Sequence, residues 1–215
     1  MIQVLYLNIA QLSEADALHL YRCAARQRQE KARRFHSRKD AQRCIAAGAL
    51  LQYAYFTRTG SPMPELSLAP LGKPFFSSAP DFHFNLSHSG DWVAVAFGDE
   101  EVGLDIAQVT REQKQLAVAR RFFTEAEREY VFCQNADPHL RFFEVWTAKE
   151  SYLKYLGTGL SQGLSTFCVR SPQDLGAQIH TEFPEAELCL SVCACSGRWN
   201  LQKLTARELM ACGCF

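Results

Sequence analysis

The chain has 215 residues, of which 47% are hydrophobic and 21% are charged, and its formal net charge at pH 7 is zero. This composition is ordinary for a folded protein with a sizeable core and excludes a disordered chain. Apolar runs such as residues 45–51 fall short of the roughly 20 residues of a membrane helix, and residues 1–4 lack the basic start of a signal peptide. We therefore expect a cytoplasmic protein that does not enter a membrane.

The first half begins with an alternating strand at residues 4–9 and a helix that starts at Ser13. A basic helix follows. Asp40 then resembles the N-cap of a core helix that ends near Thr59, because the apolar residues between them recur at helical spacing. Beyond the turn-rich residues 62–80, three strands are expected, at residues 82–86, 92–97 and 102–106, and residues 98–101 would join the last two as a hairpin.

The second half predicts helices from about residue 111 and from Thr124, and a long helix over residues 140–156 that Gly157 stops. The tail favours strands, at residues 166–169, 178–183 and 188–194. The pattern indicates an α+β fold whose two halves meet near residues 105–110.

Nine cysteines are present, and their odd number and irregular spacing argue against a secreted disulfide framework and favour reduced thiols. Those near the C-terminal end lack the paired C-x-x-C spacing of a zinc site: Cys189, Cys193, Cys195, Cys212 and Cys214. Over residues 188–195 cysteine and serine alternate with Leu, Val and Ala, as in a strand with small, partly buried side chains on one face. Packing is therefore the preferred interpretation, and a zinc cluster is the alternative.

Positive charge is concentrated between Arg22 and Arg43, a segment with nine basic residues and only two acidic ones, Glu30 and Asp40. The segment is either a solvated helix surface or a phosphate-binding patch. A nucleic-acid-binding protein would need a more extensive basic surface, so we expect no nucleic acid partner.

Two carboxylates lie inside apolar segments, Asp105 in residues 102–106 and Glu150 in residues 146–154. Ionised groups are costly to bury unless they are paired or bind a cation, so this pair suggests a hard-metal site built from a strand and a helix. On the strand Asp105 shares its face with Gly103, which would leave room for a ligand. The structural alternatives are an aspartate that ends a strand and an exposed Glu150–Lys154 helix pair.

Residues 84–90 end a predicted strand with hydrogen-bonding side chains. A Ser-His-Asp hydrolase is excluded, because Ser87 and His88 would point to opposite faces of the strand and no G-x-S-x-G motif is present. A Walker phosphate loop is absent as well, because Pro74 follows Gly72-Lys73.

Five motifs occur along the chain in this order: Gly72-Lys73-Pro74, Phe84 to Ser89, Val102 to Ile106, Arg121-Phe122-Phe123 followed by Glu127, and Trp146 to Leu160. Taken together, they resemble the motifs of the 4'-phosphopantetheinyl transferases of the surfactin-synthetase type. The resemblance implies a monomer with two similar α/β halves that form a pseudo-dimer, which we place at residues 1–107 and 108–215. It also implies coenzyme A and Mg²⁺ in the cleft between the halves.

The resemblance also assigns roles to individual side chains. Asp105 and Glu150 would be the metal ligands that hold Mg²⁺ on the coenzyme A pyrophosphate. Lys154, Ser87 and His88 would contact phosphates, and Lys154 with His88 would offset charge that grows on the leaving group.

Further family positions fall in the first half. Lys73 and Pro74 would border the adenine. Lys31, with Arg28 where a lysine is usual, would meet the ribose phosphate. Cys44 stands in the place of a common threonine, which puts one phosphate contact in question.

The implied reaction is attack by a serine hydroxyl of an acyl or peptidyl carrier protein on coenzyme A, with release of adenosine 3',5'-bisphosphate. Glu150 is the first choice of general base and Glu127 the second. The carrier would dock on residues 108–123. The family usually has Asp-x-Glu, but this chain has Asp105-Ile106-Ala107, so one expected metal ligand is missing. Mg²⁺ tolerates this if water fills the position.

Ala107 motivates one alternative, a non-catalytic coenzyme A-binding protein of the same fold. A second alternative is a phosphate- or RNA-binding module that uses the basic segment, although no aromatic interleaving supports it.

Overall fold

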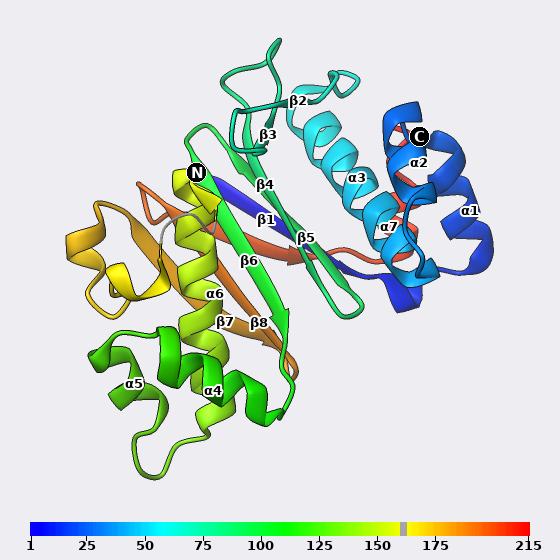
Figure 1. Cartoon of the computed structure of the whole chain (residues 1–215). Coiled ribbons are helices and arrows are strands. Elements are labelled where there is room, and N and C mark those ends of the chain that lie inside the picture. The colour runs from blue at the N-terminus through cyan, green and yellow to red at the C-terminus, as the bar shows by residue number, and fades with distance from the viewer. Residues whose placement is uncertain (160–162) are drawn as a thin grey trace.

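The structure is a computed structural model that describes residues 1–159 and 163–215. Two β-sheets pack face to face, and each carries one long helix on its outer face (Figure 1). Leu160, at the end of the fifth family segment, lies outside the described residues. The predicted α+β class is confirmed. None of the helices in the described residues is long and apolar enough to cross a bilayer.

The first sheet has the strand order β4-β5-β1-β9. These strands are β1 Ile2–Asn8, β4 His83–Ser89, β5 Trp92–Gly98 and β9 Trp199–Lys203. Its helices are α1 Glu14–Cys23, α2 Arg26–Arg33, α3 Arg38–Thr59 and the short α7 Ala206–Met210. A two-stranded hairpin of β2 Ser67–Leu68 and β3 Pro74–Phe75 follows α3.

The second sheet has the order β6-β8-β7, with antiparallel neighbours. Its strands are β6 Val102–Gln108, β7 Gln178–Glu185 and β8 Leu188–Ala194. Its helices are α4 Gln113–Phe122, α5 Glu125–Val131 and α6 Pro138–Leu156. Short 3-10 helices occur at Ile9–Gln11, Leu164–Thr166 and Pro172–Leu175.

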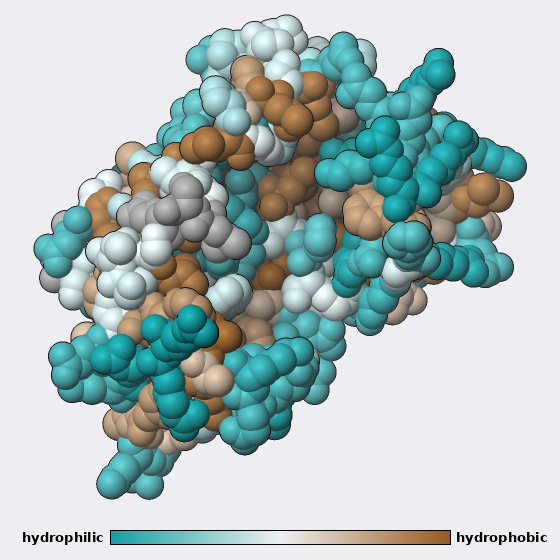
Figure 2. All heavy atoms as spheres, in the orientation of Figure 1, coloured by the Kyte–Doolittle hydropathy of each residue, from teal (hydrophilic) through white to brown (hydrophobic). Residues whose placement is uncertain are grey.

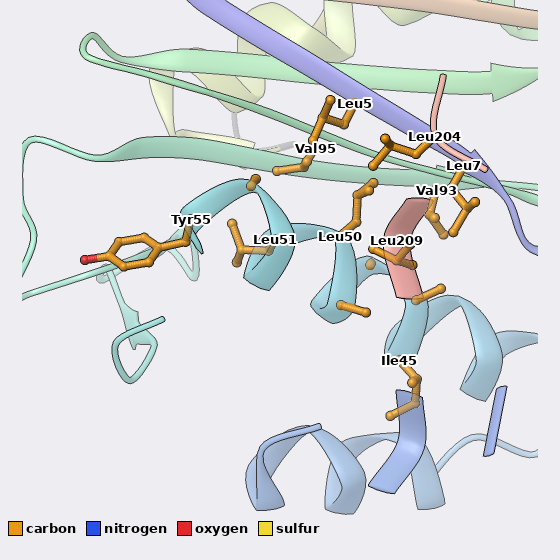
Figure 3. Close-up of a cluster of buried hydrophobic side chains, with 14 of the residues drawn as sticks. Leu5, Leu7, Ile45, Leu50, Leu51, Tyr55, Val93, Val95, Leu204 and Leu209 are labelled. Atoms are coloured by element: carbon orange, nitrogen blue, oxygen red, sulfur yellow. The ribbon is translucent and has the colours of Figure 1, made fainter. Parts of the chain in front are cut away.

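Helix α3 crosses the outer face of the first sheet, and its apolar side chains pack against the strands to form the core of the first half. Leu50 and Leu51 are fully buried between α3 and the strands β1 and β5 (Figure 3). Leu204 and Leu209, from the end of the chain, complete this cluster and are also fully buried. The C-terminal segment is thus part of the first half's core.

The start of α3 differs from the prediction. Its N-cap is Ser37, whose hydroxyl accepts a hydrogen bond from the backbone N–H of Asp40. Asp40 lies in the first turn instead, where a negative charge interacts favourably with the helix dipole. The N-cap at Ser13 and the stop at Gly157 are confirmed, the latter with a φ of 69°.

The predicted hairpin between the second and third strands is wrong. β5 already has β4 on one edge and β1 on the other, so it offers no free edge to β6. The chain therefore passes from the first sheet to the second after Gly98, and β6 pairs with β8. The hairpin that does form joins β4 to β5 through Gly90, whose φ of 57° suits a tight turn.

The strand expected at residues 166–169 is also absent, because this stretch is a 3-10 turn and a bend. The carbonyls of Leu164 and Phe167 accept hydrogen bonds from the buried Lys149 ammonium, so they are not available to a sheet.

Strand β9 was not predicted, and it crosses the proposed division between residues 1–107 and 108–215. It pairs in parallel with β1 of the first sheet, from Ile2 opposite Trp199 to Tyr6 opposite Lys203. The two-domain division and the internal duplication remain predictions, with residues 199–209 packed against the first half.

Candidate active site

The site lies where the edge strands β4 and β6 meet beside the C-terminal half of α6 (Figure 1). Asp105 on β6 is buried, and its Oδ1 is 2.6 Å from the Lys154 Nζ. The Ser87 hydroxyl donates to the same oxygen over 2.8 Å and accepts from Lys154 over 3.0 Å. The structure thus brings together three of the predicted residues, from three elements.

Glu150 lies one turn before Lys154 on α6 and is partly buried. Burial raises its pKa, the nearby charge of Asp105 raises it further, and Lys154 opposes the rise. Within the part of the chain that the structure describes, no hydrogen-bonding partner contacts its carboxylate. Two carboxylates that repel each other at one site favour the binding of a cation.

The donor set fits Mg²⁺ with partial protein coordination. Asp105 and Glu150 offer carboxylate oxygens, the ligand type that Mg²⁺ prefers, and this ion normally keeps several waters. Among residues 1–159 and 163–215 no group of three acidic, histidine or cysteine side chains is arranged as a metal site. Ala107, two residues after Asp105, is buried in the core of the second half.

Gly103 does not leave room for a ligand, contrary to the expectation. A Cβ at this position would lie 1.9 Å from the Ser151 carbonyl oxygen and 2.4 Å from the Tyr155 backbone nitrogen. The glycine therefore permits β6 and α6 to approach closely, which brings Asp105 within reach of Lys154.

Cationic groups gather beside His88, whose side chain is exposed. Partial desolvation by nearby protein atoms and the charges of Arg43 and Lys154 lower the pKa of His88. Arg43 donates to the Gly90 carbonyl over 2.7 Å and pairs with Asp40. Its Nε is buried and has no hydrogen-bond partner among the described residues. This cluster of positive groups with an unused donor suits an anion.

Sequence reasoning did not single out Arg43. It was counted only as part of the basic segment, and its signal was its position directly before Cys44 on the core helix.

The basic segment also shapes a cavity between α2 and α3. Arg28 donates to the Cys44 carbonyl over 3.0 Å and lies on Gly48, where a Cβ would be 2.2 Å from the Arg28 Cδ. The cavity has a volume of about 570 Å³, and Arg28, Gly48 and Met63 are among its lining residues. Lys31 is exposed on α2. Figure 2 shows a hollowed face between the two groups of helices, with a hydrophilic rim on the side of α1 and α2.

Lys73 ties the β2–β3 hairpin to the second half. Its ammonium donates to the carbonyls of Val102 and Tyr155, each over 3.3 Å, and pairs with Glu101. Pro74 lines a cavity of about 330 Å³ together with aromatic residues of β3, of β4 and of the segment between them: Phe75, Phe76, Phe82 and Phe84.

Glu127 is held inside the core of the second half and is fully buried. Its carboxylate is 2.8 Å from the Lys149 Nζ and accepts from the backbone N–H groups of Thr124 and Val169. Both oxygens are thus bonded to protein donors, an arrangement that suits a structural ion pair.

All cysteines in the described residues are free thiols. Cys189 and Cys193 are fully buried on β8, and burial raises the pKa of each to about 12. The packing interpretation is confirmed for these two.

Comparison with known proteins shows the family of the chain. Residues 101–202 match the model of the 4'-phosphopantetheinyl transferase superfamily, and residues 11–100 match that of the 4'-phosphopantetheinyl transferase N-terminal region. The 4'-phosphopantetheinyl transferase psf-1 of Bacillus pumilus is 37% identical over 158 residues, which are 72% of this chain and 67% of the relative. The transferase Sfp of Bacillus subtilis is 34% identical over 163 residues, 74% of this chain and 71% of the relative. The transferase AcpT of Salmonella typhimurium is 36% identical over 103 residues, 47% of this chain and 54% of the relative. The chain belongs to the 4'-phosphopantetheinyl transferase superfamily.

Proposed function

We propose that this protein transfers the 4'-phosphopantetheine group of coenzyme A to a serine of an acyl or peptidyl carrier protein, with Mg²⁺ as cofactor. The observation that carries the proposal is the meeting of Asp105, Glu150 and Lys154 at the junction of the two halves, in a chain of this family. One chain supplies the whole group, which supports action as a monomer. The cysteine pattern favours a cytoplasmic location.

In the reaction the carrier hydroxyl forms a P–O bond to the pantetheine-side phosphorus while the pyrophosphate P–O bond breaks. Asp105 and Glu150 would hold Mg²⁺, and this ion would neutralise charge on the pyrophosphate. Lys154 lies beside Asp105, where its ammonium can stabilise the negative charge that develops on the leaving phosphate. His88 and Arg43 supply further positive groups at the same edge.

Glu150 is the proposed general base. Among the described residues no hydrogen-bonding partner contacts its carboxylate, so this side chain could accept the serine proton, directly or through a water molecule. Glu127, the second choice, is less suited, because its carboxylate is fully buried and already bonded to protein donors.

For the nucleotide, the proposal places the ribose phosphate near Arg28 and Lys31, beside the cavity between α2 and α3. Cys44 contributes its carbonyl to Arg28 and so orients that side chain. The adenine would lie near Lys73 and Pro74.

The carrier protein is proposed to dock on residues 108–123. Arg120 and Arg121 lie in the last turn of α4, and Phe122 is 40% exposed beside the Arg121 guanidinium. An acidic, partly apolar surface would complement this segment.

The test is incubation with coenzyme A, Mg²⁺ and a panel of apo-carrier proteins, followed by intact mass measurement. Gain of one phosphopantetheine by a carrier supports the proposal. If coenzyme A binds but no carrier gains mass, the protein is a coenzyme A binder of the same fold, the alternative that Ala107 suggests.

A further inference from the structure

Three polar side chains of β4 accept hydrogen bonds from the backbone of β6. Asn85 Oδ1 accepts from the Leu104 N–H over 3.1 Å and Ser87 Oγ accepts from the Ile106 N–H over 3.2 Å. Ser89 Oγ accepts from the Gln108 N–H over 2.9 Å. Each acceptor is 19 residues before its donor, so β4 and β6 run in the same direction at these contacts. We call these three bonds the side-chain ladder.

The side-chain ladder stands where main-chain pairing would otherwise occur. β4 and β6 are edge strands of different sheets, and no backbone hydrogen bond joins them in the described residues. β6 pairs along its other edge with β8, so the N–H groups that face β4 need partners from the first sheet. Asn85 and Ser87 are buried, so loss of an acceptor there would leave a buried N–H group unpaired.

Two features of the side-chain ladder concern the site. The amides of Leu104 and Ile106 flank Asp105, and the middle acceptor, Ser87, also donates to the Asp105 carboxylate. In β4, His88 lies between Ser87 and Ser89. The same bonds therefore fix the Asp105 carboxylate on the second sheet relative to His88 on the first sheet.

We infer that Asn85 and Ser89 are positioning residues for the transfer reaction. The inference rests on the proposed function. Neither side chain needs to touch the substrate. Each holds β6 against β4 on one side of Ser87, so that Asp105 on β6 and His88 on β4 keep a fixed separation. Geometry of this kind controls turnover when two groups must act on the same substrate.

The experiment compares Asn85→Ala and Ser89→Ala with two controls. Ser89→Thr keeps the hydroxyl acceptor, and Val95→Ala removes buried volume from the first half, within the core on the α3 side of the sheet. NMR amide hydrogen exchange at Leu104 and Gln108 measures the side-chain ladder without reference to activity. kcat and KM for coenzyme A measure its effect on the reaction, and the free energy of unfolding is measured for every variant.

We expect Asn85→Ala to speed exchange at Leu104, and Ser89→Ala to speed exchange at Gln108, each by about tenfold or more, the equivalent of ~1.4 kcal/mol. kcat should fall by about tenfold while KM changes little. Val95→Ala should keep kcat despite its loss of stability, and Ser89→Thr should keep both the protection and kcat. Ser89 is only partly buried, so its variants test the inference even if Asn85→Ala fails to fold.

Unchanged amide protection in the Ala variants would overturn the side-chain ladder. Lost protection with a kcat equal to that of Val95→Ala would show that the bonds serve the fold alone and would overturn the positioning role. If the wild-type protein modifies no carrier while protection is lost as expected, the proposed function fails and the hydrogen bonds stand.

Discussion

His88 lies beside Arg43 and Lys154, so its protonation reports on the charge of whatever occupies the site. Its pKa is lowered in the free protein, and a bound phosphate should raise it by stabilising the imidazolium. We expect an upward shift of the His88 titration, measured by NMR, when coenzyme A or adenosine 3',5'-bisphosphate is added. His88→Gln identifies the resonance. A titration that does not move with ligand would remove His88 from the anion site.

The same shift has a consequence for stability. The folded-state pKa of His88 is below its unfolded value of about 6.5, so the unfolded state takes up the proton first as the pH falls. His88 therefore contributes a loss of stability that grows below about pH 6.5 and is absent at higher pH.

Ala107→Glu tests whether the missing family ligand can be restored. Ala107 follows Asp105 by two residues on β6, so both side chains project to the α6 side of the sheet. A third carboxylate should lower the Mg²⁺ concentration for half-maximal activity by about tenfold, the equivalent of ~1.4 kcal/mol. Activity is measured across a Mg²⁺ titration, and circular dichroism checks the fold, because position 107 is buried. An unchanged Mg²⁺ requirement in a folded variant would place Ala107 away from the metal.

At the scale of elements, the contact of β6 with α6 depends on Gly103. A methyl group there would overlap the backbone of α6 at Ser151, which cannot move as a flexible side chain can. We expect Gly103→Ala to lower the free energy of unfolding by ~1–3 kcal/mol or more. Gly163→Ala is the control, because the nearest atom to a Cβ at this position would be the Thr166 methyl carbon, 3.4 Å away. Equal urea midpoints for the two variants would contradict the close approach.

The ion pair of Glu127 and Lys149 joins α5 to α6 inside the second half. Glu127→Gln would leave the buried ammonium without its partner, at a cost of ~3–5 kcal/mol. We expect Glu127→Gln with Lys149→Met to recover part of this loss, as measured by urea denaturation. The kcat of folded Glu127→Gln should stay within about threefold of wild type. A much larger fall in kcat with little loss of stability would instead favour Glu127 as the general base.

Much of this organisation could be predicted from local signals. Periodicity placed α3 and α6, Ser13 marked the start of α1, and Gly157 marked the end of α6. The error at the start of α3 arose because Ser37 and Asp40 are both good capping residues three positions apart, and only the backbone geometry distinguishes them.

Pairing between distant strands could not be predicted in the same way. The short connection between β5 and β6 favours a hairpin, but both edges of β5 are already paired. One edge pairs with β4 and the other with β1, which lies far away in the chain. β9 was missed because only Trp199 and Leu201 of its residues are apolar, and its place is set by the free edge of β1. Asp105 and Glu150 were found because a carboxylate in an apolar segment is a local signal, whereas Arg43 was hidden in a run of basic residues.

For the whole molecule, the two sheets share one apolar interface, so the halves act as one body around their common edge (Figure 1). The buried residues of this interface come from β1, β5, β6 and β8, among them Val4, Ala94, Leu104 and Leu190. Such an arrangement lets side chains from both halves act on one ligand with fixed separation.

The central claim is that Asp105 and Glu150 hold the cation for transfer. The most direct measurement is the initial rate of carrier modification, by intact mass, for wild type, Asp105→Asn and Glu150→Gln across a range of Mg²⁺ concentrations. Each substitution removes a charge but keeps the side-chain shape. We expect each folded variant to lose at least about a hundredfold in rate, the equivalent of ~2.7 kcal/mol of barrier, and the wild type to depend on Mg²⁺. Wild-type rates in both folded variants would contradict the account.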